Sequence, residues 1–529
     1  MRSIEIPQPN ERDLKYRLFE ILPAALTWTI LSLPIVLGAL SPKLAAYFII
    51  AYLLIWFARA VALNLRSLQG YRLIEQHKKV PWAKLNADLE LLEPHTKEAP
   101  RWHARNLDRV REHISHNRIK PGEVYHAIFI AFVDESRDIL EPTIESVLAS
   151  DYDLKKVILI LAYEERAGPA SEKLANSLIT DYGSRFYHAE AIGHPFGILG
   201  EVIGKGGNVT YAGRRLKKFL EEKKIDPLHV LVTTLDSDNR PHKQYLGALT
   251  YTYCSTEEPR YASYQPIPMY TNNIWDAPAP MRVIATGNSF WMVIQSLRPH
   301  TLRNFSAHAQ PMAALIDTDF WSVRTIVEDG HQYWRTYFRY DGKHDVFPVF
   351  VPIYQDAVLA ATYRKTIKAQ FLQVRRWAYG ASDVAYVAKM GLLTKNPIPK
   401  HLFWAKFGRL LEGHVSWSTA SLILLLAAPV PFLLNPESYI ANQIPQIARW
   451  LQTVATVGIL VTLYLSMRSL PPKPARYRRH RTVWMILQWI YLPLTSIVFG
   501  SFAAIYSQTR LALGRYIGKF DVTEKAVKK

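Results

Sequence analysis

Four long runs that are almost free of charged side chains constrain this chain more than any other feature. They cover residues 21–40, 44–63, 415–434 and 450–467, and only Arg59 interrupts them. About 20 helical residues cross the ~30 Å hydrocarbon core of a bilayer. All four runs lie outside the polar middle of the 529-residue chain, which disfavours the alternative that they are buried helices of a soluble protein. The pattern predicts two pairs of membrane-spanning helices on either side of a large polar domain.

A fifth uncharged run, residues 482–509, is longer and contains Pro493 and Gly500. It fits one tilted span, a broken helical hairpin or a helix that lies in the membrane interface. The first apolar run begins about 20 residues into the chain and is too long for the apolar core of a signal peptide. We therefore expect a membrane anchor there and no cleavable leader.

The short loops predict how the chain is oriented in the membrane. Residues 435–448 contain no Lys or Arg, whereas residues 468–481, "RSLPPKPARYRRHR", are rich in arginine. Basic loops stay on the cytoplasmic side, so the central block 64–414 is expected in the cytoplasm of an integral plasma (inner) membrane protein. The net charge of +19 fits contact with anionic membrane lipids, and because the basic residues flank the spans we expect no nucleic-acid partner. The single cysteine, Cys254, excludes an intrachain disulfide and fits a reducing compartment.

Three strands that end in acidic residues are predicted in the central block. The runs 126–136, 156–166 and 229–238 are apolar and close on carboxylates, and a helical pattern follows the first of them at 141–150. This alternation predicts a mostly parallel, open α/β sheet, which binds ligands at the carboxyl ends of its strands. The acidic residues expected at that edge are Asp134, Glu135, Glu164, Glu165, Asp236 and Asp238.

The stretch "TTLDSDNRPH", residues 233–242, places Asp236 and Asp238 one residue apart at the end of the third strand. Taken alone, such a pair is more often a turn with an aspartate as helix cap. At the edge of a sheet with other acidic strand ends, it is better explained as a site for Mg²⁺ or Mn²⁺, which proteins hold with one or two carboxylates plus substrate phosphates. The cation would stabilise a diphosphate leaving group.

Two further motifs supply candidate groups. "GKGGN" (204–208) allows close backbone approach and offers Lys205 to a phosphate, although it lacks the spacing of a P-loop and could be an ordinary glycine turn. "TIVEDGHQYW" (325–334) places Glu328 and Asp329 after an apolar lead-in, where a carboxylate can act as general base. Its alternative is a pair of acids that stabilises a helix start.

"QFLQVRRWAYG" (370–380) combines arginines, which pair with phosphate, and a tryptophan, which offers a flat face to a sugar ring. The alternative is an amphipathic helix at the membrane interface with snorkelling arginines. The candidate residues in this stretch are Gln373, Arg375, Arg376 and Trp377.

Taken together, these motifs resemble those of membrane-embedded, processive-type family 2 glycosyltransferases, the group that includes cellulose, chitin and hyaluronan synthases. The family order of two acidic strand ends, Asp-x-Asp, Thr-Glu-Asp and Gln-x-x-Arg-Trp is matched by Glu135, Glu164, "DSD", "VEDG" and "QVRRW". The tail "FDVTEK" (520–525) is similar to the gating-loop motif of cellulose synthases. The resemblance covers residues 120–390, the apolar segments and the tail.

The resemblance implies an α/β GT-A-type (Rossmann-like) glycosyltransferase domain inserted between N- and C-terminal transmembrane helices. Its donor would be a nucleotide-diphosphate sugar, bound by Glu135, Glu164, Lys205 and Asp236. Asp236 and Asp238 would hold the metal ion, and Asp329 would be the base of an inverting transfer. The diphosphate and acceptor would contact Glu328, Gln373, Arg375, Arg376 and Trp377, and the gating loop would contain Phe520, Val522, Thr523 and Lys525.

Some positions depart from the family pattern. "AYEER" stands where many members have two aspartates, "VED" replaces "TED", and there are fewer spans than in cellulose synthase. A cytoplasmic gating loop also requires that residues 482–509 not form one complete span, so an interfacial or re-entrant segment is favoured there.

The expected segments are a cytoplasmic N-terminus (1–20), a transmembrane hairpin (21–63), a linker (64–119), the GT-A domain (120–390), an interface segment (391–414), a transmembrane pair (415–467) and a basic loop, interfacial or re-entrant helix and gating tail (468–529).

Three functions remain open at this point. The favoured one is extension of a glycan from a cytoplasmic nucleotide sugar, with a coupling to export left open. The second is transfer of one sugar to a polyprenyl phosphate or another lipid. The third, from a different class, is an inactive membrane scaffold or transporter, which the intact acidic motifs disfavour. It is also left open whether the protein forms a homo-oligomer, binds an accessory export subunit, or does neither.

Overall fold

A single eight-stranded mixed sheet lies at the centre of the soluble part of the computed structural model, which describes residues 3–113 and 118–526. Its strand order is β3-β2-β1-β4-β7-β6-β8-β5. The three strands predicted from acidic-ended apolar runs are present as β1, β2 and β4, and the sheet confirms an α/β domain. The strands are β1 (Tyr125–Phe132), β2 (Val157–Glu164), β3 (His188–His194), β4 (Val230–Asp236), β5 (Arg240–Pro241), β6 (Ala262–Tyr270), β7 (Ala309–Pro311) and β8 (Asp345–Gln355).

The first half of the sheet is parallel. β1 pairs in parallel with β2 and β4, and β2 pairs in parallel with β3. Parallel strands end at the same edge, so the chain leaves β1 at Phe132, β2 at Glu164 and β4 at Asp236 along one side of the sheet.

The second half of the sheet is mixed. Only the short strands β7 and β5 run against the other six, so the prediction of a mostly parallel sheet is confirmed apart from these two strands. β7 runs antiparallel to both β4 and β6, β8 is parallel to β6, and β5 is antiparallel to β8. β7 has only three residues, too few to stand out as a strand in the sequence. β7 connects β4 to β6 and β8, and the chain at the carboxyl ends of β6 and β8 supplies further groups to the acidic edge.

Helices cover both faces of the sheet because successive side chains of a strand point to opposite sides. On β1, Ile128 and Ile130 pack into one apolar core, and Ala127 and Phe129 pack into the other. The helices of the soluble part are α3 (Trp82–Leu91), α4 (Arg101–His113), α5 (Arg137–Leu148), α6 (Pro169–Tyr182), α7 (Lys205–Lys223), α8 (Tyr245–Cys254), α9 (Ala279–Ser296), α10 (Met312–Asp317), α11 (Glu328–Arg339), α12 (Tyr363–Ala378) and α13 (Asp383–Ala388).

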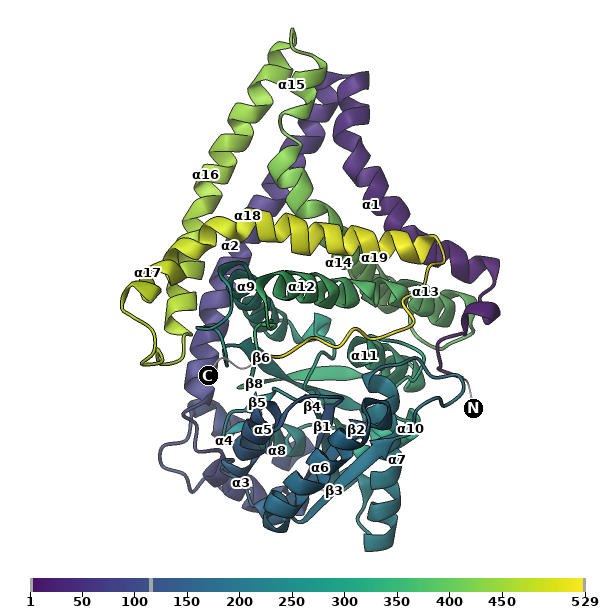
Figure 1. Ribbon diagram of the computed structural model, residues 1–529, viewed down its shortest axis with the longest axis vertical. Coiled ribbons are helices and arrows are strands. Elements are labelled where there is room, and N and C mark those ends of the chain that lie inside the picture. The colour runs from purple at the N-terminus through teal and green to yellow at the C-terminus, as the bar shows by residue number, and fades with distance from the viewer. Residues whose placement is uncertain (1–2, 114–117, 527–529) are drawn as a thin grey trace.

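Four helical stretches of the described chain are long and apolar enough to cross a membrane. They are α1 (Leu14–Leu40), α2 (Pro42–His77), α16 (Tyr439–Arg468) and the continuous stretch His480–Ala512. The run 415–434 is divided between the end of α14 (Lys400–Leu426) and α15 (Val430–Leu434), and the chain leaves the helix at 427–429. Figure 1 shows α1, α2, α14 and α16 rising together on one side of the sheet domain.

The stretch His480–Ala512 contains α17 (His480–Leu487), α18 (Leu492–Thr495) and α19 (Phe502–Ala512). In Figure 1 it lies across the base of α1, α2 and α16, between these helices and the sheet domain, and α19 lies above α12. Its length would allow a crossing, but it runs across the directions of α1, α2 and α16 instead of alongside them. The tail that follows α19 then returns beneath it toward the sheet.

Candidate functional site

Asp236, the last residue of β4, forms an ion pair with the buried lysine of "GKGGN". Its Oδ1 accepts a hydrogen bond from Nζ of Lys205 at 2.8 Å, and its Oδ2 accepts one from Oγ of Ser306 at 2.8 Å. Lys205 is the first residue of α7, and only 9% of it is exposed. The chain turns directly after the strand, where the Asn239 amide donates to the Asp236 carbonyl.

Asp238 pairs with a second lysine, which comes from the C-terminal tail. Its Oδ1 accepts a hydrogen bond from Nζ of Lys525 at 2.7 Å, and its Oδ2 accepts one from the backbone amide of Asp356 at 2.9 Å. Asp356 directly follows β8, and its own Oδ1 is buried without a hydrogen-bond partner in the described chain. Two carboxylates and one ammonium group therefore share this end of the site.

Asp329 reaches the same site from the first turn of α11. Its Oδ2 lies 3.8 Å from Nζ of Lys205, so one lysine faces both Asp236 and Asp329. Its Oδ1 lies 3.5 Å from Nδ1 of His308 and has no hydrogen-bond partner among the described residues. That nitrogen of His308 donates to the Phe305 carbonyl at 2.9 Å, while Nε2 accepts from Trp321. His308 is thus held as a neutral imidazole, and burial lowers its pKa in agreement.

The pKa values of the site carboxylates are shifted in opposite directions. Burial and the adjacent charge of Asp329 raise the pKa of Glu328 to about 8, and burial and the charge of Asp238 raise the pKa of Asp356 to about 7. Burial acts in the same direction on Asp236, but Lys205 and Lys525 overcome it and hold its pKa well below the ordinary value. At neutral pH Asp236 is therefore charged, whereas Glu328 is mainly protonated.

Of the two acidic strand ends predicted to bind the nucleotide, the structure brings one to the site. Oε1 of Glu135 accepts a hydrogen bond from Oγ of Ser237 at 2.8 Å and lies 3.8 Å from Nζ of Lys525. Glu164 ends β2 as a buried residue and is paired with Arg166. Within the described residues no hydrogen bond or ion pair joins Glu164 to the aspartates.

The "QVRRW" motif lies at the end of α12, and its arginines hold the tail. The guanidinium carbon of Arg376 lies 3.9 Å from the ring centroid of Phe520, and Arg375 forms an ion pair with Asp521. Burial lowers the pKa of Arg376, and the charges of Glu328, Asp236 and Asp329 oppose that effect. Arg376 therefore belongs to the charged site. Trp377 packs against Tyr270, with ring centroids 6.3 Å apart, and Gln373 accepts a hydrogen bond from Gln370.

The tail, residues 519–526, crosses the edge of the sheet as an extended segment. The Phe520 amide donates to the Ile203 carbonyl at 2.8 Å, and the Ala526 amide donates to the Leu359 carbonyl at 2.9 Å. Lys525 lies between these anchors and points into the acidic site, whereas Val522 is 37% exposed. No hydrogen bond of the Thr523 side chain is found among the described residues. The predicted gating segment thus lies over the site, with Phe520 and Lys525 as its inward-facing members.

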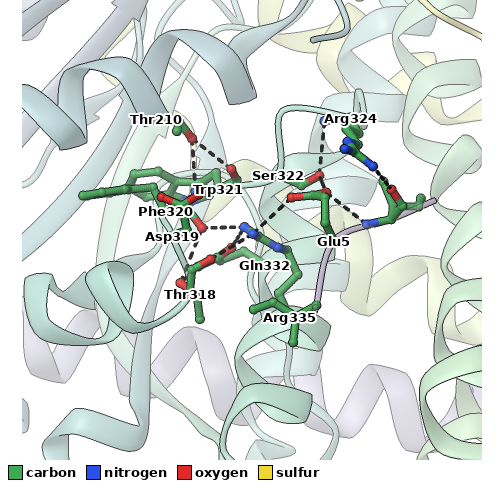
Figure 2. Close-up of polar contacts among 12 residues, drawn as sticks. Glu5, Thr210, Thr318, Asp319, Phe320, Trp321, Ser322, Arg324, Gln332 and Arg335 are labelled. Atoms are coloured by element: carbon green, nitrogen blue, oxygen red, sulfur yellow. Dashed lines mark hydrogen bonds and ion pairs between the residues drawn. The ribbon is translucent and has the colours of Figure 1, made fainter. Parts of the chain in front are cut away.

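A buried polar network supports the turn that precedes α11, as Figure 2 shows. Arg335 donates to the carbonyls of Thr318 and Phe320, and its Nη2 lies 3.2 Å from Oε2 of Glu5. Glu5 also accepts from the hydroxyl of Ser322. The Ser322 carbonyl in turn leaves no room for a side chain at position 206, where an added Cβ would lie 2.4 Å from that oxygen. The second glycine of "GKGGN" is therefore needed for close approach to the protein's own backbone.

Several residues of the site were not predicted from the sequence. Asp356, Ser306, His308 and Ser237 contact the predicted carboxylates, and Glu5 supports the frame. Only Asp356 could have been found from the sequence, because it closes the apolar run 345–356 in the way that acids close the runs of β1, β2 and β4. Ser306 and His308 lie in an irregular loop, where no periodic pattern points to them.

The donor atoms fit a divalent cation held jointly with a diphosphate. No group of three or more His, Cys, Asp or Glu side chains arranged to hold a metal occurs among the described residues. Asp238 and Asp356 nevertheless offer oxygen ligands side by side, and burial together with the charge of Asp238 raises the pKa of Asp356. Mg²⁺ and Mn²⁺ prefer such oxygen ligands and commonly take the rest from substrate phosphates.

A separate cavity of about 600 Å³ opens between α3, α4 and α8. Aromatic rings line it, among them Trp82, Trp102 and Tyr251, and none of the site carboxylates borders it.

No protein-family model and no curated protein matches the chain. Among solved structures it is similar to the mannosyltransferase PcManGT from Pyrobaculum calidifontis in complex with GDP-Man and Mn²⁺, with 12% identity, coverage of 82% of this chain and 98% of that one, and a TM-score of 0.37. It is also similar to S. aureus TarS 1–349 in complex with UDP-GlcNAc, with 11% identity, coverage of 74% and 93%, and a TM-score of 0.36. GalNAc-T7 with UDP, GalNAc and Mn²⁺ shows 10% identity, coverage of 55% and 58%, and a TM-score of 0.32. Similarities this low carry no argument for the activity of this chain.

Proposed function

We propose that this protein is a membrane glycosyltransferase that moves a sugar from a cytoplasmic nucleotide-diphosphate sugar to a hydroxyl of a glycan acceptor. The observation that carries the proposal is the meeting of three aspartates with two lysines at one sheet edge. Lys205 faces Asp236 and Asp329, and Lys525 faces Asp238. Lysines placed among carboxylates in this way offer positive charge to a substrate that brings its own negative charge.

The base in this proposal is Asp329. Its Oδ1 has no hydrogen-bond partner in the described chain and could accept the proton of an acceptor hydroxyl. The hydroxyl oxygen would form a bond to the anomeric carbon, and the bond from that carbon to the diphosphate oxygen would break, with its electron pair leaving on the nucleoside diphosphate. Attack opposite to the leaving group inverts the anomeric centre. General-base catalysis of this kind contributes roughly 10²–10⁴ to the rate.

Positive side chains surround the place where the diphosphate would acquire charge. Lys205 is buried, Lys525 and Arg376 are half-buried, and all three are charged and act on the aspartates. Cationic groups preorganised around a leaving group stabilise the transition state more strongly in a dry site than in water. Asp236, Asp238 and Asp356 would hold Mg²⁺ or Mn²⁺, which when bound would neutralise part of the diphosphate charge.

We assign Glu135 to nucleotide binding, and we assign Glu164 the same role on the family resemblance. The tail "FDVTEK" would be the segment that closes over the nucleotide. The arginines of α12 would follow the tail, because Arg375 pairs with Asp521 and Arg376 stacks on Phe520. Plasma-membrane location with a cytoplasmic catalytic domain rests on the apolar helices and the basic loop 468–481.

A second candidate is transfer of one sugar directly to a lipid phosphate, which the small number of candidate spans favours. An inactive scaffold or transporter is disfavoured, because a scaffold gains nothing from buried, mutually repelling carboxylates such as Asp238 and Asp356.

The proposal is tested by titrating purified protein with nucleoside diphosphates and nucleotide sugars in the presence and absence of Mn²⁺. Binding is expected to require the cation, and Asp238→Ala is expected to abolish the cation-dependent part. Exchange of the exposed Asp319 for alanine is the matched control, since its carboxylate lies outside the site and pairs with Arg214. Absence of nucleotide binding under every condition would contradict the proposal.

A further inference from the structure

The cavity of about 600 Å³ between α3, α4 and α8 lies at the edge of the sheet opposite to the catalytic carboxylates. Ala262 and Asp345, the paired first residues of β6 and β8, border it. Asp356 follows the other end of β8, and at about 3.3 Å per residue the 11 residues of this strand place its two ends roughly 30 Å apart. Figure 1 shows α3, α4 and α8 below β6 and β8, on the side away from α1 and α16. The cavity is therefore separate from the catalytic site.

Aromatic rings form one wall of the cavity, and Trp102 of α4 is the central member of this wall. The centroid of its ring system lies 6.1 Å from that of His77, 5.9 Å from that of Trp82 and 5.7 Å from that of Tyr251. Trp82 and Tyr251 are buried, whereas Trp102 is half-buried. No hydrogen bond of the Trp102 indole N–H is found among the described residues. Trp102 thus offers both ring surface and a free donor at the cavity.

A buried chain of hydrogen bonds fixes a polar group beside this wall. Nε2 of His103 lies 3.1 Å from a carboxylate oxygen of Asp88, and Nδ1 of His103 lies 2.7 Å from the Tyr251 hydroxyl. The carboxylate requires a proton on Nε2, so in the neutral imidazole Nδ1 accepts from the hydroxyl. The Tyr251 oxygen in turn accepts from the side-chain amide of Asn106 at 3.3 Å. This bond orients the amide of Asn106, which lines the cavity, and leaves its carbonyl oxygen and second N–H bond for a ligand.

Charged side chains of both signs surround the cavity without pairing. The lining includes Arg109, Glu257, Glu258, Lys343 and Asp345, all of them exposed. Within the described parts of the chain, none of these five side chains forms an ion pair. Three carboxylates and two cations leave a net charge of −1, which disfavours a polyphosphate such as a nucleotide. Unpaired donors and acceptors around an aromatic wall instead suit a neutral ligand that carries many hydroxyl groups.

We propose that this cavity binds a neutral saccharide, with the C–H face of a sugar ring on Trp102 and hydroxyl groups on Asn106 and the charged rim. The C–H groups of a sugar ring are slightly positive and face the negative side of an aromatic ring. A hydroxyl both donates and accepts, so it can bond to the carboxylates of Glu258 and Asp345 and equally to the rim cations. The volume lies within the range of about 300–1,000 Å³ that is usual for small-molecule sites. The site does not rest on the proposed function, and a short saccharide held there does not reach the proposed base.

Two competing explanations assign the cavity differently. In the first, the aromatic wall is only the solvent-facing border of the core, and no saccharide binds. In the second, the rings hold a quaternary ammonium ion by cation–π attraction, which the two rim cations disfavour. Calorimetric titration of the purified full-length protein separates these explanations from the proposal, with maltotriose, cellotriose, mannotriose and triacetylchitotriose as ligands. Sorbitol, which has hydroxyl groups but no ring, and choline are the comparison ligands, and the detergent must carry no sugar head group.

We expect at least one trisaccharide to bind about 10-fold or more tightly than sorbitol and choline, because only a saccharide offers both a ring face and hydroxyl groups. Trp102→Ala and Asp345→Ala should each weaken that binding by about 10-fold, and Asp345 is exposed, so its variant tests the site even where loss of Trp102 disturbs packing. Glu145→Ala is the matched control, since it removes an exposed carboxylate of α5 that does not border the cavity. Binding of no trisaccharide overturns the proposal, as does equal binding of sorbitol or choline, or unchanged affinity in both variants.

Hydrogen exchange measured by mass spectrometry locates the bound saccharide. Saturating trisaccharide should slow exchange in α4 and in residues 252–258, and should leave the amides of Phe520 and Ala526 in the tail unchanged. Slower exchange in the tail alone would place the saccharide on the catalytic edge and overturn the proposal. Protection at the cavity in a protein that binds no nucleotide would contradict the proposed function and support the saccharide site.

Discussion

Replacement of Lys525 by methionine removes the positive charge that the tail inserts into the acidic site. Nζ of Lys525 lies 2.7 Å from Asp238, 2.6 Å from the Ser237 hydroxyl and 3.8 Å from Glu135. Methionine keeps a similar length and apolar volume, so the change isolates the charge. In its absence the carboxylates at this end of the site repel one another, and Asp238 loses its cationic partner.

The magnitude follows from the burial of this pair. Removal of one partner from a buried ion pair costs roughly 3–5 kcal/mol, because the other charge stays buried and unpaired. The folded protein can avoid part of this cost by releasing the tail, since water then reaches Asp238. We therefore expect the equilibrium between docked and released tail to shift by at least about 100-fold, which corresponds to about 3 kcal/mol at 1.4 kcal/mol per factor of ten.

Hydrogen exchange measured by mass spectrometry reports this shift directly. The amides of Phe520 and Ala526 are bonded to the carbonyls of Ile203 and Leu359, so both are protected only while the tail is docked. Their protection should fall about 100-fold in Lys525→Met and remain unchanged in Lys519→Met, which removes an exposed lysine of the same segment. Unchanged protection in Lys525→Met would refute the conclusion that the lysine charge holds the tail on the site.

Two further predictions concern the frame of the site. Gly206→Ala should lower the stability of the protein by about 1–3 kcal/mol, because the new Cβ would meet the Ser322 carbonyl at 2.4 Å, whereas Gly287→Ala in open space should be neutral or stabilising; thermal unfolding of the two variants checks this. Glu328 has a pKa of about 8 in the folded protein against an ordinary 4.5, so between these values the folded state binds more protons than the unfolded state and stability falls as the pH rises. Glu328→Gln should flatten the decline in melting temperature between pH 5 and pH 8, and an equally steep decline in that variant would show that another group causes it.

The sequence predicted the elements that local patterns determine. The apolar runs that became β1, β2 and β4 are short, continuous and closed by acids, so their type and their shared edge could be inferred. The acidic edge with Asp236 and Asp238 followed from the parallel arrangement of strand ends, whereas Asp329 in the first turn of α11 was indicated only by the "VEDG" motif. The antiparallel β7 was missed because three residues carry too little periodic signal.

Contacts between distant segments could not be predicted in the same way. Asp238 and Lys525 are 287 residues apart in sequence, and no local pattern at either position indicates that their side chains meet. Glu164, a strand end predicted to contact the nucleotide, forms an ion pair with its neighbour Arg166, and no pattern in the sequence indicated that pair.

The most direct test of the central claim is single-turnover transfer by Asp329→Asn compared with its affinity for the nucleotide. The substitution keeps the shape of the side chain and removes its ability to accept a proton. We expect the rate of transfer to fall by roughly 10²–10⁴, because that is the usual contribution of a general base, while the dissociation constant of the nucleoside diphosphate with Mn²⁺ stays within a few-fold of the unmodified protein. Transfer at an undiminished rate in Asp329→Asn would contradict the assignment of this residue as the base.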